Sequence, residues 1–147
     1  MSSIAEGKPA PEFSAQDEQG NLVKLSDFKG KKNVVLYFYP KDDTPGCTIE
    51  ACNFRDSYTR FQDKDTQILG VSFDDAGSHQ AFKDKFQLPF PLLVDEDRDI
   101  ARAYGVKGDK FPNRDTLVID KAGCITRIIR SVDPGGHDKE LLEVLEK

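Results

Sequence analysis

The chain has 147 residues, of which 37% are hydrophobic and 32% are charged, and its formal net charge is −5. This length and composition fit one globular domain that spans residues 1–147. The acidic balance argues against binding to nucleic acid or to anionic lipid, and no apolar run is long enough to span a bilayer.

The first half of the chain predicts a β-hairpin followed by a β-α-β unit. Gly20 and Asn21 lie between two short strand-like runs, which predicts an N-terminal hairpin. The run "NVVLYFY" is apolar on both faces and predicts a buried central strand. The expected elements are strands at 13–15, 22–25 and 33–39, a helix from 45 to about 62, and a strand at 67–73.

The second half predicts two more helices, a short strand, a closing hairpin and a terminal helix. Ser78 is the expected N-cap of the next helix, on which Phe82 and Phe86 are four residues apart. The expected elements are a helix at 78–86, a strand at 92–94, a helix at 99–104, strands at 116–119 and 124–130, and a helix at 137–146.

This order predicts the fold class. Strands that alternate with helices favour a partly parallel sheet, and the closing hairpin makes that sheet mixed. We therefore expect a thioredoxin-like α/β fold: a central mixed β-sheet with helices on both faces, preceded by the N-terminal β-hairpin.

The stretch "TPGC" places a cysteine at a helix start. Thr44 is a good N-cap, and Pro45 is tolerated at the first helical position. Cys47 then lies in the first turn, where free N–H groups and the helix dipole favour a thiolate, the reactive form of cysteine. Gly46 leaves room for a substrate or backbone to approach. The alternative is that Cys47 is a small apolar residue that faces the sheet.

The three cysteines are an odd number in a chain without an apparent signal peptide, which argues against structural disulfides and favours a cytoplasmic protein. Cys52 follows Cys47 by five residues. In a helix this spacing separates the Cα atoms by about 8–9 Å, whereas a disulfide needs them within roughly 7 Å. The two sulfurs can therefore bond only if the first turns unwind. A chance core cysteine is the alternative for Cys52.

The motif "YPKDDTPGCTIEACNFRD" resembles the peroxiredoxins of the bacterioferritin comigratory protein and peroxiredoxin Q branch. The segments "KPAPEF", "GVSFD", "LPFPLLVDED" and "NRDTLVIDKAGCI" resemble the same family, so the resemblance covers the whole chain. It implies a thiol-dependent peroxidase in which Cys47 is the peroxidatic cysteine and Cys52 the resolving one. The two would form an intramolecular disulfide.

The resemblance also implies roles for four more residues. Thr44 would hydrogen-bond the peroxide, Pro40 would shield the pocket, Arg114 would stabilise the thiolate, and Glu50 would orient an arginine. The implied substrates are hydrogen peroxide and alkyl hydroperoxides. The implied reductant is thioredoxin, with glutaredoxin as the alternative. No metal or organic cofactor is expected, and we expect a monomer rather than a dimer.

Other candidate residues receive simpler interpretations. Cys124 is expected to be structural or incidental, and His79 and His137 are expected in surface or capping roles. Arg55 is expected either to hold Glu50 by a salt bridge or to lie on the helix surface. The acidic stretch 95–99 lacks the calcium-loop pattern, so we expect a solvated loop there.

Two other functions remain open on the sequence. A thioredoxin-like disulfide oxidoreductase would need a Cys-x-x-Cys motif, which is absent. A peroxide-responsive redox sensor or holdase, in which oxidation of Cys47 exposes a partner surface, is compatible with an unwinding helix.

Overall fold

The computed structural model describes residues 4–130 and 132–146, so the expected domain range 1–147 reaches beyond them at both ends. The main sheet has five strands in the order β5-β4-β3-β6-β7. Its strands are β3 (Asn33–Phe38), β4 (Thr66–Ser72), β5 (Leu92–Val94), β6 (Thr116–Ile119) and β7 (Ile125–Ile129). A separate hairpin joins β1 (Ser14–Gln16) to β2 (Leu22–Lys24).

The sheet is mixed, as the sequence predicts. The central strand β3 pairs parallel with β4 on one side and antiparallel with β6 on the other. Strand β5 continues the parallel half, and β7 continues the antiparallel half. Because β6 runs against β3, the start of β6 lies beside the end of β3: Thr116 pairs with Tyr37. The loops that precede β6 and follow β3 therefore meet at one edge of the sheet.

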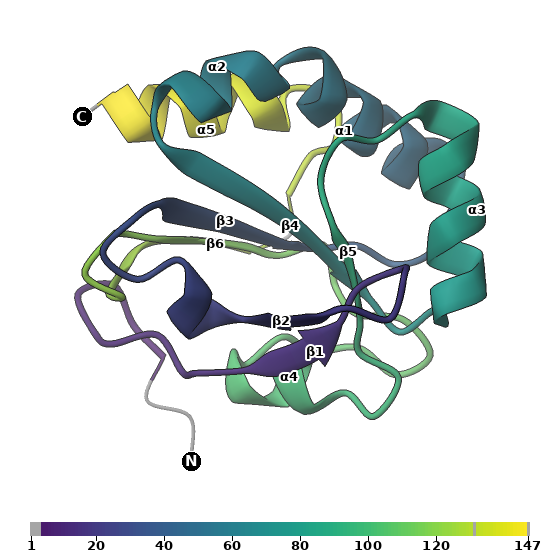
Figure 1. Cartoon of the computed structure of the whole chain (residues 1–147), viewed down its shortest axis with the longest axis horizontal. Helices are drawn as coiled ribbons and strands as arrows, with labels where there is room; N and C mark the ends of the chain where they lie inside the picture. Colours follow the sequence, from purple (N-terminus) through teal and green to yellow (C-terminus); the bar gives the residue numbers. More distant parts are fainter. Residues whose placement is uncertain (1–3, 131, 147) are drawn as a thin grey trace.

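Helices cover both faces of the sheet (Figure 1). One face carries α1 (Pro45–Asp56), α2 (Tyr58–Asp63), α3 (Ala76–Phe86) and α5 (His137–Glu146). The opposite face carries the β1–β2 hairpin, the short 3-10 helix η1 (Leu25–Asp27) and α4 (Asp99–Ala103). None of the helices in the described residues is long and apolar enough to cross a membrane.

The residues of β3 show why it occupies the centre. Val34, Leu36 and Phe38 point into the core under the hairpin and α4. Val35 and Tyr37 alternate with them and point into the core under α1, α2, α3 and α5. Since successive strand residues face opposite sides, a strand that is apolar at every position from 34 to 38 is buried only between two covered faces.

Two local predictions about helices are wrong. The helix expected from 45 to about 62 is divided at Ser57, where α1 ends and α2 begins. Helix α3 begins before Ser78, and its N-cap is Asp75, whose carboxylate accepts the Ser78 backbone N–H at 2.8 Å. Both errors have a local cause. The apolar periodicity continues through the break at Ser57 and so does not reveal it. At the start of α3, Asp75 and Ser78 are both suitable N-cap residues, and Asp75 takes the position.

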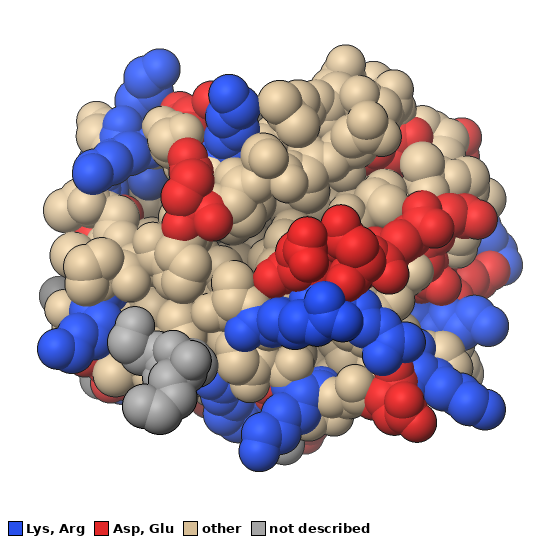
Figure 2. All heavy atoms as spheres, turned by 90° about the horizontal axis from the view of Figure 1, so that it is seen from below, with Lys and Arg blue, Asp and Glu red and all other residues tan. Residues whose placement is uncertain are grey.

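The molecular surface that carries the hairpin and α4 has no single dominant charge. Figure 2 shows acidic and basic side chains gathered in adjoining clusters on this side of the molecule. This face therefore does not present the continuous basic surface that binding to a phosphate backbone favours.

Candidate active site

Cys47 lies in the first turn of α1, as predicted, and its side chain is buried. Pro45 is the first helical residue, and the Thr44 carbonyl accepts the Thr48 N–H at 2.8 Å. The backbone N–H groups of Gly46 and Cys47 are in the turn that has no partner within the helix. The sulfur is thus held where a helix favours an anion.

Thr44 occupies the N-cap position, but its hydroxyl does not cap the helix. The hydroxyl instead donates to the Lys41 carbonyl at 2.9 Å, which closes the loop 40–44 on itself. Pro40 is half-buried at the start of this loop, directly after the buried Tyr39.

Arg114 joins Cys47 to Glu50. Its Nη2 donates to Cys47 Sγ at 3.4 Å, and its Nη1 donates to Glu50 Oε1 at 2.8 Å. Arg114 is 67 residues from Cys47 in sequence. The pairing of β6 against β3 brings it there, because Arg114 precedes β6 and α1 follows β3. Two predicted site residues, Cys47 and Glu50, therefore meet at the guanidinium of a third, Arg114.

Gly46 allows this approach. A Cβ atom at Gly46 would lie 3.0 Å from Arg114 Nη2, closer than nearly all real Cβ contacts. The sequence predicted that Gly46 leaves room for a substrate or backbone, and the group that comes close is the Arg114 guanidinium.

Glu50 is a buried acid with one oxygen paired. Burial raises the pKa of Glu50 to about 7, against the opposing effects of the Arg114 charge and hydrogen bond. Within the described residues, Glu50 Oε2 has no hydrogen-bond partner. Burial lowers the pKa of Arg114, but Glu50 and Cys47 outweigh it and raise that pKa above its ordinary value. Arg114 therefore stays charged beside the sulfur.

The sequence of the chain is similar to those of a known protein family. A model of the AhpC/TSA family matches residues 6–128 of the chain. The chain belongs to the AhpC/TSA family. A chloroplastic peroxiredoxin Q of Oryza sativa subsp. japonica is 45% identical over 147 aligned positions, which cover 97% of this chain and 67% of the rice protein. A putative peroxiredoxin bcp of Coxiella burnetii is 43% identical and covers 95% of this chain and 97% of its own length.

A solved structure gives the same result. The crystal structure of peroxidoxin BcpB from Mycobacterium tuberculosis matches this peroxiredoxin with a TM-score of 0.92 and 32% identity, over 97% of each chain. The predicted relation to the peroxiredoxin Q and bacterioferritin comigratory protein branch is confirmed, as is the thioredoxin-like fold. The protein is a thiol peroxidase.

The two cysteines of α1 are free thiols in this peroxiredoxin, and Cys52 is half-buried. Both lie within the intact helix, where their spacing does not allow a disulfide. Cys124 lies at the turn between β6 and β7, beyond Ile119, which pairs with Val34 at the start of β3. Cys47 follows the other end of β3, so the length of that strand, about 20 Å, separates the ends where these two cysteines lie.

Two hollows of the described surface lie away from Cys47. A cavity of about 310 Å³ is lined by residues that include Cys124, Phe28 and Lys32. A groove of about 330 Å³ runs between the hairpin and α4. Neither includes a predicted site residue among its lining residues.

Of the surface or capping roles expected for the two histidines, the surface role is wrong, because both side chains are buried. His79 is fully buried and contacts Asp42, and His137 is buried and bonds to the Thr116 hydroxyl at 2.7 Å. The sequence held a signal for His79, because it precedes Phe82 by three residues and so shares the buried face of α3. Burial lowers the pKa of His137 to about 4, although Glu140 opposes this.

Two further predictions concern charged residues. Arg55 does not hold Glu50; it pairs with Asp56 at 3.0 Å and donates to the Phe86 carbonyl at 2.8 Å, so the helix-surface interpretation is correct. Asp95 is not solvated: it is buried and accepts the backbone N–H groups of Ile100 and Ala101, each at 3.0 Å. It thereby satisfies the first turn of α4, which sequence inspection missed.

Proposed function

We propose that this thiol peroxidase acts through Cys47 as the peroxidatic cysteine and Cys52 as the resolving cysteine. The observation that carries the proposal is the 3.4 Å contact between Arg114 Nη2 and Cys47 Sγ at the start of α1. A cationic donor and a helix N-terminus act on the same sulfur, and both favour its thiolate.

In the first step, the Cys47 thiolate attacks the terminal oxygen of a hydroperoxide. The O–O bond breaks, the sulfur becomes a sulfenic acid, and the leaving oxide takes up a proton to give water or an alcohol. Arg114 would stabilise the charge that develops on the peroxide oxygens. The Thr44 hydroxyl, which donates to the Lys41 carbonyl, still has lone pairs that can accept the peroxide O–H.

In the second step, the Cys52 thiol condenses with the sulfenic acid, releases water and forms a disulfide. The first turns of α1 must unwind for this bond to form, because the intact helix holds the two Cα atoms too far apart. A dithiol of the thioredoxin type then reduces the disulfide and restores both thiols. Hydrogen peroxide and alkyl hydroperoxides are the proposed substrates.

The test compares the wild type with Cys47→Ser in a coupled assay that supplies thioredoxin, its reductase and NADPH. We expect wild-type turnover with hydrogen peroxide or an organic hydroperoxide and none from the variant. Substantial residual turnover in Cys47→Ser would remove Cys47 from the centre of the mechanism.

A further inference from the structure

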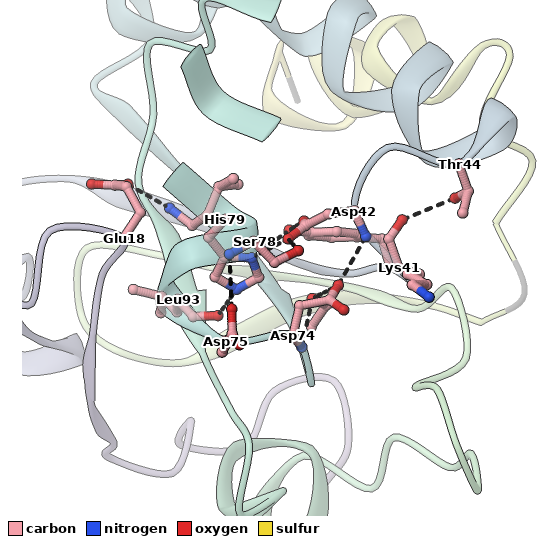
Figure 3. Close-up of polar contacts among 12 residues, drawn as sticks. Glu18, Lys41, Asp42, Thr44, Asp74, Asp75, Ser78, His79 and Leu93 are labelled. Atoms are coloured by element: carbon pink, nitrogen blue, oxygen red, sulfur yellow. Dashed lines mark hydrogen bonds and ion pairs between the residues drawn. The ribbon is translucent and has the colours of Figure 1, made fainter. Parts of the chain in front are cut away.

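A buried network of polar side chains holds the loop 40–44 that leads into α1 (Figure 3). The carboxylate of Asp42 accepts the hydroxyl of Tyr39 at 2.5 Å and that of Ser78 at 2.8 Å. Its Oδ2 also lies 2.7 Å from Nδ1 of His79. The Asp42 and His79 side chains are almost fully buried, so these bonds are not in competition with solvent.

The backbone of the same loop is held as well. The N–H of Asp42 donates to Asp74 Oδ2 at 2.8 Å, and the Ser72 hydroxyl donates to the same oxygen at 2.9 Å. The loop is thus attached to the end of β4 through Ser72 and Asp74, and to α3 through Ser78 and His79. Neither attachment involves α1, Arg114 or Glu50.

The hydrogen bonds of His79 define its protonation. Its Nε2 lies 2.8 Å from the Leu93 carbonyl, which can only accept, so Nε2 carries a proton. Burial alone would lower the pKa of His79, but the hydrogen bond and charge of Asp42 outweigh it, and the pKa is raised. A carboxylate oxygen accepts, so the 2.7 Å contact with Asp42 Oδ2 is made by a second N–H, at Nδ1, and His79 ties the loop to β5.

The same bonds argue against a metal ion at this place. One ligand atom each from Asp42, Asp74 and His79 lies within 4.8 Å of the others, a separation that could hold an ion. A histidine binds metal through an unprotonated nitrogen, and here both ring nitrogens are used as donors. The network is a set of satisfied hydrogen bonds around one ion pair.

We propose that Asp42 and His79 are positioning residues of the peroxidase reaction: their pairing fixes the loop 40–44, and so sets the place of Thr44 relative to Cys47. This inference rests on the proposed roles of Thr44 and Cys47. Asp42 is two residues from Thr44, and the loop between them turns sharply at Asp43, which has a φ of 57°. A shift of the Asp42 anchor therefore moves Thr44.

Two properties of the site depend on different groups. The thiolate of Cys47 depends on Arg114 and on the first turn of α1. The approach of a peroxide depends in addition on the position of Thr44. Loss of the Asp42–His79 pair is therefore expected to slow the reaction with peroxide while the sulfur remains reactive toward an alkylating agent, which makes no use of Thr44.

The experiment uses the full chain with Asp42→Ala and His79→Ala. The control is Lys83→Met. Lys83 lies on α3, the helix of His79, and pairs with Glu18 at 3.1 Å without touching the loop 40–44. We expect the second-order rate constant for hydrogen peroxide to fall about 10- to 100-fold in both alanine variants, as for a misplaced reactant. The rate of Cys47 alkylation by iodoacetamide should stay within about 3-fold of wild type, because the thiolate itself is kept.

The control should change neither rate. Peroxide and alkylation rates that fall together, or a peroxide rate that stays at the wild-type value, would overturn the proposal. If the proposed function itself were wrong, Cys47→Ser would retain activity. If only the positioning role were wrong, Cys47→Ser would be inactive and the two alanine variants would react with peroxide as fast as the wild type.

Asp42→Asn keeps the question testable if an unpaired buried group prevents folding of the alanine variants. The asparagine carbonyl can accept the Tyr39 hydroxyl, and its NH₂ can donate to Ser78 Oγ and to Nδ1 of a neutral His79. We expect a peroxide rate within about 3-fold of wild type, because the loop keeps its anchor. Loss of this rate with unchanged alkylation would mean that charge rather than position matters, and would overturn the proposal.

Nitrogen-15 NMR of the imidazole gives an independent readout. Both ring nitrogens of His79 should be protonated in the wild type, because each lies against an oxygen that accepts, and only Nε2 should be protonated in Asp42→Asn. An unprotonated Nε2 in the wild type could not donate to the Leu93 carbonyl, and would contradict the proposal that His79 ties the loop 40–44 to β5.

Discussion

Arg114 and Cys47 meet at 3.4 Å although they belong to opposite halves of the chain. The contact depends on the planar shape of the guanidinium, because the second terminal nitrogen of the same group binds Glu50 at 2.8 Å. A guanidinium presents several donors in a fixed fork, whereas an ammonium is a single point charge. The orientation of the arginine, and not only its charge, is therefore defined by the site.

Arg114→Lys should lower the rate of reaction with hydrogen peroxide by about 100-fold, the usual cost of one lost donor in an oxyanion site. The lysine keeps a positive charge but cannot hold Glu50 and the sulfur in the same fork. Stopped-flow measurement of peroxide consumption tests this. Arg55→Lys changes a surface arginine of α1, the helix that carries Cys47; it is the control and should react at the wild-type rate. An Arg114→Lys protein as fast as this control would contradict the geometric argument.

Gly46→Ala should slow the peroxide reaction by about 10-fold, because a Cβ would meet Arg114 Nη2 at 3.0 Å and displace it. Gly77→Ala is a matched control, since Gly77 is likewise the second residue of its helix and its nearest contact would be an ordinary 3.5 Å. The control should be neutral in activity and more stable by about 0.5–1 kcal/mol. Equal activity of the two variants would exclude a special role for the Gly46–Arg114 approach.

The sequence was most informative where a local pattern has one structural meaning. The fully apolar run at β3 required two covered faces, and "TPGC" required a helix start. It was least informative about contacts between distant segments. Nothing near His79 in sequence names Asp42, because the two residues meet only when α3 packs beside the end of β3.

The same limit applies to the two helix errors. The break at Ser57 and the choice of Asp75 over Ser78 depend on small differences in local free energy. Apolar spacing does not report such differences. By contrast, the spacing of His79 to Phe82 does predict its burial, because helical periodicity places polar as well as apolar residues on the buried face.

Glu50 should make the stability of the protein decrease as pH rises. Its pKa is raised from an ordinary value of 4.5 to about 7 in the fold, so the folded state holds a proton that the unfolded state releases. The ionised carboxylate is thus disfavoured by folding: the penalty is complete above pH 7 and disappears as pH falls toward 4.5. At 1.36 kcal/mol per pKa unit, the penalty is at most roughly 3 kcal/mol.

Glu50→Gln tests this, because glutamine can still accept from Arg114 but does not ionise. Guanidinium unfolding between about pH 4.5 and 8.5 should show the variant becoming more stable relative to wild type as pH rises to about 7, and the difference should then level off. The difference between the two proteins is the useful quantity, since Asp95 and His137 titrate in both. Parallel pH curves for the two proteins would mean that Glu50 ionises as freely in the fold as in water.

Asp95→Asn should reveal a similar but separate dependence at lower pH. Burial raises the pKa of Asp95 from 3.8 to about 6, although the N–H groups of Ile100 and Ala101 oppose the shift. The penalty for ionising Asp95 in the fold is therefore present above about pH 6 and is relieved as pH falls toward about 4. The relative stability of the variant should rise between these two pH values and then level off. A flat difference in unfolding free energy over this range would contradict the assignment.

Cys52→Ser should complete one turnover and then stop. Because α1 holds Cys47 in its first turn whether or not residue 52 carries a thiol, the first oxidation should proceed at close to the wild-type rate. The sulfenic acid then lacks an intramolecular partner and should persist long enough to be trapped by dimedone and weighed by mass spectrometry. Cys124→Ser is the matched control: that thiol lies beyond the far end of β3, so recycling by thioredoxin should remain normal. Continuous turnover of Cys52→Ser, or a Cys47–Cys124 disulfide in peptide maps of the oxidised wild type, would transfer the resolving role away from Cys52.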